Sequence, residues 1–234
     1  MKTFALMAMA MAMLMQCSSP AYAHEPGDGP STSPAQISCG TIKASAIVAE
    51  GGNSLLTTAH FIRKCQKDGH PVKVLGFPDD AFSAPSPYVN DFADIAILGD
   101  YVAMHGRGTL LSTWDCSREP NTPYRNHLFS VGFPNGAPYE VNVVGSFKEN
   151  TGKYFAAVDG YVAPGMSGAP VYDDVGRTVG MVRASIYDLE TGEDANIYLM
   201  VRADAICKLV EEADRLFQSG IETINFVNPA SADK

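Results

Sequence analysis

Short apolar runs alternate with turn-rich segments along most of this 234-residue chain. Runs of roughly four to eight residues rich in Val, Ile, Leu and aromatic side chains, bounded by Gly, Pro, Asn and Asp, are typical of antiparallel strands. A mixed segment at 99–126 divides these runs into two groups. The pattern predicts an all-β chain built from two barrels, although the second group alone also fits a sandwich. The first group contains 45–49, 54–58, 71–77 and 95–98, and the second contains 128–133, 140–144, 153–158, 171–172, 178–182 and 197–201.

Helical spacing of apolar residues is evident near the end of the chain, after Asp204, where it predicts an amphipathic helix that packs on the barrels. Asp204 is expected to be its N-cap, and Gly220 lies past its end. The apolar positions are Ile206, Leu209, Val210, Ala213, Leu216 and Phe217. The resulting domain order is a flexible leader at 24–36, the first barrel at 37–110, an interdomain linker at 111–125, the second barrel at 126–202, the helix at 203–219 and a loose tail at 220–234.

The first 23 residues have the pattern of a secretory signal peptide. Lys2 supplies the positive start, 4–15 form an uninterrupted apolar run, and a small-x-small cleavage site ends at Ala23. Because this run of 12 residues is too short to span a bilayer, a retained membrane anchor is the weaker alternative. Cys17 leaves a lipoprotein site open, although Gln16 stands where a small residue is expected. We therefore expect secretion, extracellular or periplasmic, after cleavage near Ala23, with no integral membrane anchor.

Charge narrows the classes of partner. The net charge is −9, and it becomes −10 when the signal is removed with Lys2. An acidic surface argues against nucleic acid and anionic membranes as partners and favours solubility. The hydrophobic fraction of 46% is that of an ordinary globular protein.

Four cysteines remain after removal of the signal: Cys39, Cys65, Cys116 and Cys207. An even number in an exported protein indicates two disulfides, with three connectivities possible. Metal binding is the alternative use of four cysteines, but neither a Cys-x-x-Cys pair nor clustered histidines support it. We expect no metal and no cofactor.

A serine between glycines offers the first candidate chemistry. In Gly165-Met166-Ser167-Gly168 the hydroxyl is held on a tight turn before the apolar run Val171-Tyr172. Glycine allows the backbone to approach a reacting carbonyl and leaves nearby N–H groups free to face a developing oxyanion. Taken alone, the motif fits an ordinary tight β-turn better than a nucleophile.

A nucleophilic serine also needs a base and a group that orients the base. His60 follows a strand that ends in small residues, and Asp94 enters the buried apolar strand 95–98. Either residue alone has an ordinary structural explanation, a buried histidine or a turn cap. The order His60, Asp94, Ser167 separates this chain from the subtilisin and α/β-hydrolase orders of the same three residues.

The three blocks together resemble the trypsin-like serine endopeptidases. Thr57-Thr58-Ala59-His60, 94–98 and 165–170 are similar to their signature blocks, and the spacing is most similar to the compact bacterial branch with glutamyl endopeptidases and the HtrA protease domain. The resemblance covers about residues 40–215 and implies a chymotrypsin-like fold of two six-stranded antiparallel β-barrels with a C-terminal α-helix. It implies that His60 is the general base, that Asp94 orients it and that Ser167 attacks, with the N–H groups of Gly165 and Ser167 as the oxyanion hole.

The resemblance also suggests a substrate pocket formed by Tyr161, Arg183, Ala184 and Ser185. Tyr161 is neither the aspartate that selects Arg and Lys nor an open apolar floor, so trypsin-like specificity is not expected. Val182 stands where the similar glutamyl endopeptidases carry a histidine. Arg183 is expected either to attract an acidic side chain or to point to solvent.

The resemblance further suggests the disulfide pairing. Cys39 and Cys65 bracket His60 much as one disulfide does in many trypsin-like enzymes, although the spacing here is wider. This leaves Cys116 in the linker to pair with Cys207 near the start of the helix.

The leading functional hypothesis is a secreted, monomeric serine endopeptidase that hydrolyses proteins or peptides through an acyl-enzyme on Ser167. Two alternatives remain open from the sequence. One is a catalytically silent, protease-like binding protein whose substrate cleft is closed, with Tyr161 as the obstruction. The other is an esterase on the same fold.

Overall fold

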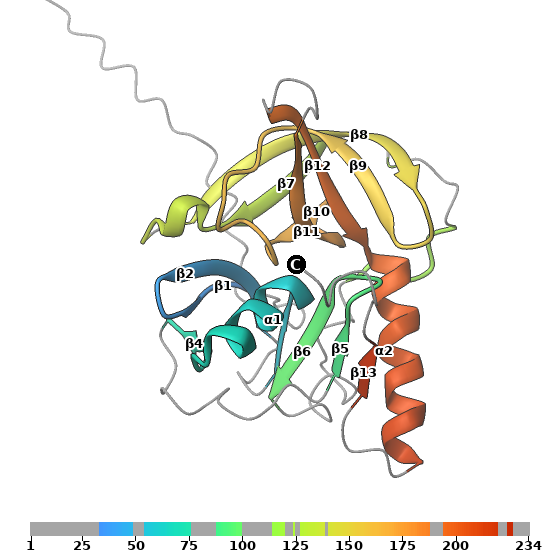
Figure 1. The fold of residues 1–234 in the computed structure, drawn as a ribbon. Coiled ribbons are helices and arrows are strands. Elements are labelled where there is room, and N and C mark those ends of the chain that lie inside the picture. The colour runs from blue at the N-terminus through green and yellow to red at the C-terminus, as the bar shows by residue number, and fades with distance from the viewer. Residues whose placement is uncertain are drawn as a thin grey trace, which may run out of the picture.

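The structure is a computed structural model of the chain. It describes residues 33–48, 54–75, 88–99, 114–119, 124, 127–138, 140–187, 194–219 and 224–226. The expected signal peptide, including Cys17, and most of the expected leader lie outside the described residues. The described part is mostly β-structure, arranged in two halves with a long helix on one side (Figure 1).

The first half is one sheet with the strand order β13-β5-β6-β3-β2-β1-β4. All its neighbouring strands are antiparallel except β13, which adds to β5 in parallel. One face packs on helix α1 (Ala59–Asp68), whose buried side chains are Ala59, Phe61, Ile62 and Cys65. The strands are β1 (Ser33–Cys39), β2 (Ile42–Val48), β3 (Ser54–Thr57), β4 (Lys73–Val74), β5 (Tyr88–Asn90), β6 (Ile95–Gly99) and β13 (Ile224–Phe226).

The second half is a closed six-stranded barrel with the order β10-β11-β12-β9-β8-β7. Its interior is filled by a cluster of buried side chains that includes Leu128, Val158, Met166 and Tyr198. The strands are β7 (His127–Gly132), β8 (Val141–Thr151), β9 (Phe155–Asp159), β10 (Pro170–Tyr172), β11 (Thr178–Tyr187) and β12 (Asp194–Arg202). The expected two-half β architecture is therefore confirmed, with a closed six-stranded barrel in the second half. The described part of the first half is a seven-stranded sheet with one parallel pair, rather than six antiparallel strands.

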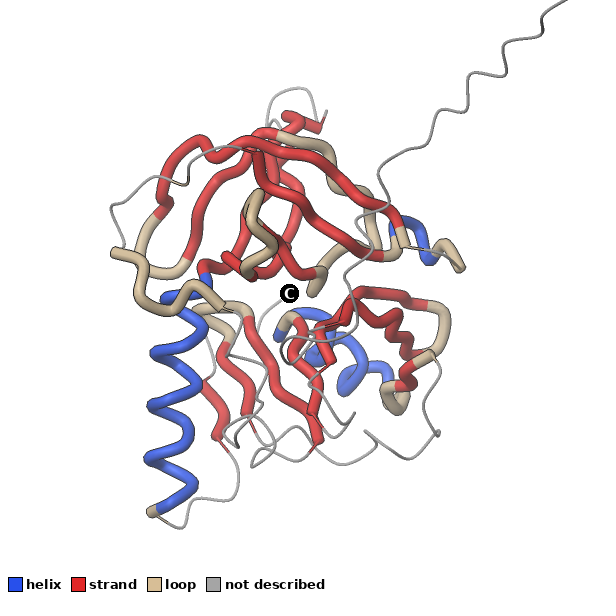
Figure 2. The backbone as a smooth tube through the Cα atoms, turned by 180° about the vertical axis from the view of Figure 1, so that it is seen from behind, coloured by secondary structure: helices blue, strands red, loops and turns tan. Residues whose placement is uncertain are grey.

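A third apolar cluster joins the halves. It contains Ile47 and Leu56 from the first sheet, Met181 and Val201 from the barrel, and Ile206 from helix α2 (Ala203–Gln218). Helix α2 starts beneath the barrel and runs along the side of the first sheet, next to β13 and β5 (Figures 1 and 2). This shared core ties both halves to α2, so that residues from the two halves can contribute to one site.

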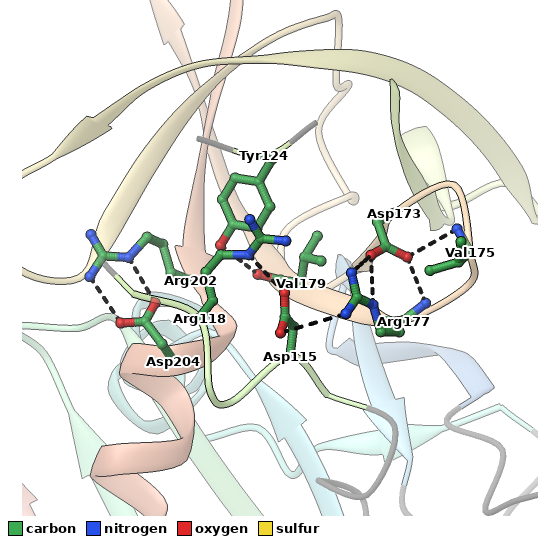
Figure 3. Close-up of polar contacts among 9 residues, drawn as sticks. All are labelled: Asp115, Arg118, Tyr124, Asp173, Val175, Arg177, Val179, Arg202 and Asp204. Carbon is green, nitrogen blue, oxygen red and sulfur yellow. Dashed lines mark hydrogen bonds and ion pairs between the residues drawn. The ribbon is translucent and has the colours of Figure 1, made fainter. Parts of the chain in front are cut away.

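The segment that crosses between the halves is held by polar contacts. The N–H of Asp115 donates to the carbonyl of Thr178 at 2.9 Å, and the Asp115 carboxylate pairs with Arg118 at 2.7 Å. Arg177 reaches from the β10–β11 turn to Asp115 and, at 2.7 Å, to Asp173 (Figure 3). These contacts fix the described part of the linker against the barrel.

Four local expectations differ from the structure. Residues 33–36 belong to β1 rather than to the leader, because they pair with β2 and bury Ala35. Asp204 lies in the first turn of α2 rather than at its N-cap, and its carboxylate binds Arg202. Residues 224–226, expected in the loose tail, form β13. Of the strand expected at 71–77, the described part forms strand only at Lys73–Val74.

Candidate active site

His60 lies at the start of α1, a helix that was not predicted from the sequence. Thr58 occupies the N-cap position but its hydroxyl makes no capping hydrogen bond. The first N–H groups of a helix lack acceptors within the helix, and the N–H of His60 donates instead to Oδ1 of Asp94 at 2.8 Å. The backbone of His60 is therefore fixed by the same residue that binds its ring.

Asp94 occupies a turn at 91–94, directly before β6, with a left-handed φ of 55°. Its carboxylate is buried, with 5% of the side chain exposed, whereas the imidazole of His60 is 51% exposed. Oδ2 of Asp94 lies 2.8 Å from Nδ1 of His60. A buried carboxylate needs hydrogen-bond donors to offset its lost hydration, and His60 supplies two of them.

The third donor to Asp94 comes from the other half of the molecule. Nε of Arg183, on β11, lies 3.1 Å from Oδ2 of Asp94. The guanidinium also lies over the ring of Phe155, 5.0 Å from its centre. From the sequence, Arg183 was expected to attract an acidic substrate side chain or to point to solvent, but its Nε binds the carboxylate of Asp94.

Ser167 lies in the turn between β9 and β10, and two sets of backbone hydrogen bonds hold this turn. Gly168 donates to the carbonyl of Val182 at 2.8 Å, and Val182 returns a bond to Ala169 at 2.8 Å. On the other side, the N–H of Ser45 donates to the carbonyl of Ser167 at 2.9 Å. The serine turn is thus bound both to the strand that carries Arg183 and to β2 of the first sheet.

The two glycines that flank Ser167 are required by geometry. Gly165 and Gly168 have left-handed φ values of 95° and 90°. A Cβ at Gly165 would lie 2.6 Å from the carbonyl oxygen of Phe133, and one at Gly168 would collide with the carbonyl oxygen of Ser45. Only glycine fits either position without moving the backbone.

The N–H groups of Gly165 and Ser167 have no acceptor among the described residues. By contrast, the neighbouring N–H groups of Met166, Gly168 and Ala169 all donate to backbone carbonyls. The turn therefore leaves the two N–H groups that an oxyanion hole would use available to an external acceptor.

The remaining expected pocket residues are Tyr161, just before the serine turn, and Ala184 and Ser185 on β11, and their environments differ. Tyr161 is 53% exposed. The hydroxyl of Ser185 donates to the carbonyl of Val162 at 2.5 Å, and Ala184 is partly buried. Ser185 thus ties the end of β11 to the segment that leads into the serine turn.

Both expected disulfide pairings are present. Cys39–Cys65 joins β1 to α1, and Cys116–Cys207 joins the crossing segment to α2. Within the described ranges, no group of His, Cys, Asp and Glu side chains is arranged to hold a metal ion. Nor does any described helix have the length and apolarity required to cross a membrane.

A sequence model of the trypsin-like peptidase domain matches residues 44–181, more than half of the chain. This chain belongs to the trypsin-like peptidase family. It is therefore a serine-type peptidase, and the chymotrypsin-like fold expected from its sequence is confirmed. No curated protein matches it.

Solved structures agree with this fold. A serine endoprotease from Yersinia pestis aligns with a TM-score of 0.59 and 16% identity, covering 80% of this chain and 64% of that one. The peptidase thus spans less than two thirds of that protein. The Rv3671c protease in its inactive form aligns with a TM-score of 0.55 and 18% identity, covering 77% of this chain and 88% of that one. An inactive mutant of Rv3671c from Mycobacterium tuberculosis H37Rv aligns with a TM-score of 0.52 and 16% identity, covering 78% of this chain and 87% of that one.

Proposed function

We propose that this peptidase is an endopeptidase in which His60, Asp94 and Ser167 form a catalytic triad. The observation that carries the proposal is the buried carboxylate of Asp94, which accepts hydrogen bonds from both the N–H and Nδ1 of His60. This arrangement fixes the tautomer in which Nε2 of His60 is free to accept a proton. The half-exposed imidazole remains accessible to a substrate.

The proposed reaction proceeds through an acyl-enzyme. Nε2 of His60 takes the proton of the Ser167 hydroxyl as Oγ attacks the carbonyl carbon of the scissile peptide bond. The resulting oxyanion accepts hydrogen bonds from the N–H groups of Gly165 and Ser167. His60 then gives the proton to the leaving amine, the C–N bond breaks, and water activated by the same imidazole hydrolyses the ester.

The test compares the wild-type peptidase with Ser167→Ala in two assays. Labelling by a fluorophosphonate probe requires an activated serine, and digestion of a peptide library reports cleavage and specificity together. We expect labelling and cleavage by the wild type and neither by Ser167→Ala. Because the base must be neutral, cleavage is also expected to fall on acidification.

The same assays separate the alternatives. Ester turnover without peptide cleavage would indicate an esterase, and failure of the wild type to react with the probe would indicate a silent binding protein.

The substrate side chain is proposed to contact the pocket residues Tyr161, Arg183, Ala184 and Ser185. Since the Nε of Arg183 is bound to Asp94, we propose no preference for acidic side chains.

We also propose that the peptidase is exported, acts as a monomer on protein or peptide substrates, and does not bind nucleic acid. The two disulfides support export, because such bonds persist in oxidising compartments. Mass spectrometry of the mature protein tests this proposal. An N-terminus close to His24 is expected, and a mature chain that retains residues 1–23 would contradict it.

A further inference from the structure

Ser45, in the middle of β2, is completely buried, and all of its polar groups are used at the serine turn or next to it. Its N–H donates to the carbonyl of Ser167 at 2.9 Å, and its hydroxyl donates to the carbonyl of Gly165 at 2.8 Å. The same hydroxyl accepts the N–H of Phe133 at 3.0 Å. The carbonyl of Ser45 accepts the hydroxyl of Thr57 at 3.0 Å.

The register of the first sheet makes these bonds possible. β2 pairs with β3 only at Ile47 and Val48. The preceding part of β2 therefore makes no backbone pairs with β3. At Ser45 the N–H on this edge binds the backbone of the serine turn instead, while the carbonyl accepts the side-chain hydroxyl of Thr57. Ser45 consequently connects β2 directly to the backbone on both sides of Met166.

We propose that Ser45 is a positioning residue for the oxyanion hole, an inference that rests on the catalytic role proposed for Ser167. An oxyanion hole works only if its N–H groups are aimed before the reaction. A peptide plane is rigid, so holding its carbonyl fixes the whole plane. By binding the carbonyls of Gly165 and Ser167, Ser45 holds the two planes on either side of the one that carries the N–H of Ser167. The first of these planes also adjoins the one that carries the N–H of Gly165, so the rotation of both N–H groups is limited.

The surroundings show why a hydroxyl is needed at this position. Gly165 has no side chain to restrain it, and its φ of 95° belongs to a region that glycine leaves easily. Without the Ser45 hydroxyl, the partly buried carbonyl of Gly165 and the buried N–H of Phe133 both lose their partner. Packing is close, because a Cβ at Gly132 would lie 2.8 Å from the hydroxyl oxygen.

The test is Ser45→Ala, with Ser130→Ala as the matched control. Ser130 on β7 is equally buried, but its hydroxyl has no hydrogen-bond partner among the described residues. With a peptide amide substrate, we expect kcat of Ser45→Ala to fall about 10-fold to 100-fold with little change in KM, somewhat less than loss of a direct oxyanion donor. Affinity for a peptide trifluoromethyl ketone, whose adduct carries an oxyanion, should fall by a similar factor.

A purely structural role would lower the unfolding temperature without this selective loss of kcat and of ketone affinity. If Ser45→Ala does not fold, Ser45→Cys replaces it, since a thiol leaves no cavity at this position but donates only weakly. Wild-type kcat and ketone affinity in the folded variant would overturn the role of Ser45 while leaving the triad intact. An inactive wild type would overturn the proposed function, and the role of Ser45 with it.

Discussion

The carboxylate of Asp94 binds residues from both halves of the peptidase. It accepts two bonds from His60, in its own half, and one from Arg183 on the barrel. A carboxylate held by three donors has little freedom to rotate, which favours a fixed imidazole. Arg183 also places a positive charge at the same carboxylate oxygen that binds the ring of His60, a contact that the sequence did not predict.

Asp94→Asn tests the orienting role. The amide keeps the size of the side chain but removes its charge and presents an NH₂ group where one carboxylate oxygen was, which favours the wrong tautomer of His60. We expect kcat to fall by about 10²-fold to 10⁴-fold, as expected for loss of the orienting group of a triad. Steady-state kinetics with a peptide amide measures this loss.

Asp173→Asn is the matched control for Asp94→Asn. Asp173 is an equally buried carboxylate bound to an arginine, but it lies in the β10–β11 turn and pairs with Arg177 at 2.7 Å (Figure 3). The Asp173→Asn variant should be less stable than the wild type but have the same kcat. Equal kinetic losses in the two variants would argue against an orienting role for Asp94.

Gly168→Ala tests the close approach of the serine turn to β2. The added methyl group would collide with the carbonyl oxygen of Ser45, which is backbone and cannot turn aside. We expect a lower unfolding temperature together with loss of probe labelling at Ser167. Gly176→Ala is the control, because Gly176 also has a left-handed φ, of 80°, but nothing lies within 4 Å of its Cβ position. The control should lose only about 1–2 kcal/mol of stability and label normally.

At the scale of elements, the sequence predicted the positions of the barrel strands better than their ends, and better than the first helix. All six barrel strands were located, because apolar runs between Gly, Pro and Asn residues are a local signal. Their lengths were not, and β8 runs from Val141 to Thr151 rather than ending at 144. The extra residues of β8 are mostly exposed, so burial leaves little trace of them in the sequence.

Elements that depend on distant partners were missed. Helix α1 has only ten residues and several charges, and the N–H of its second residue is bound by Asp94 rather than by a local cap. β13 has three residues and forms by pairing with β5. The turn around Ser167 was singled out from the sequence, whereas the contacts of Ser45 were not predicted, because they join residues 120 positions apart in the chain.

At the scale of the whole molecule, the two disulfides close chain loops of very different length. Cys116–Cys207 closes a sequence separation of 91 residues and Cys39–Cys65 one of 26. Loop-closure entropy then predicts losses of about 4.6 and 3.5 kcal/mol when each is replaced by a serine pair.

Denaturant unfolding of the two double-serine variants of the mature peptidase measures these losses. Cys116→Ser with Cys207→Ser should be the less stable variant, because its bond closes the longer loop and ties the crossing segment to α2. The reverse order would show that native packing around α1, rather than loop length, dominates.

Alkaline pH probes two of the three apolar clusters directly, because they contain buried tyrosines. Tyr88 lies in the cluster that joins the two halves, and Tyr124 and Tyr198 lie in the barrel interior. Burial raises the pKa of Tyr88 to about 12, and the hydroxyl also accepts a bond from Nδ2 of Asn90. Burial likewise raises the pKa values of Tyr124 and Tyr198. An unfolded tyrosine ionises near pH 10, so the contribution of these groups to stability is fully present below pH 10 and is lost as the pH rises through the folded pKa.

We therefore expect stability to fall steeply above about pH 10. In rapid pH-jump experiments, which limit damage to the disulfides, the ultraviolet absorbance of tyrosinate should rise in two phases. Exposed tyrosines ionise at once, and the buried ones ionise at the rate of unfolding. Tyr88→Phe should reduce the slow amplitude and flatten the alkaline loss of stability. A single fast phase that accounts for every tyrosine would show that these cores admit hydroxide without unfolding, contrary to the burial on which the shared core depends.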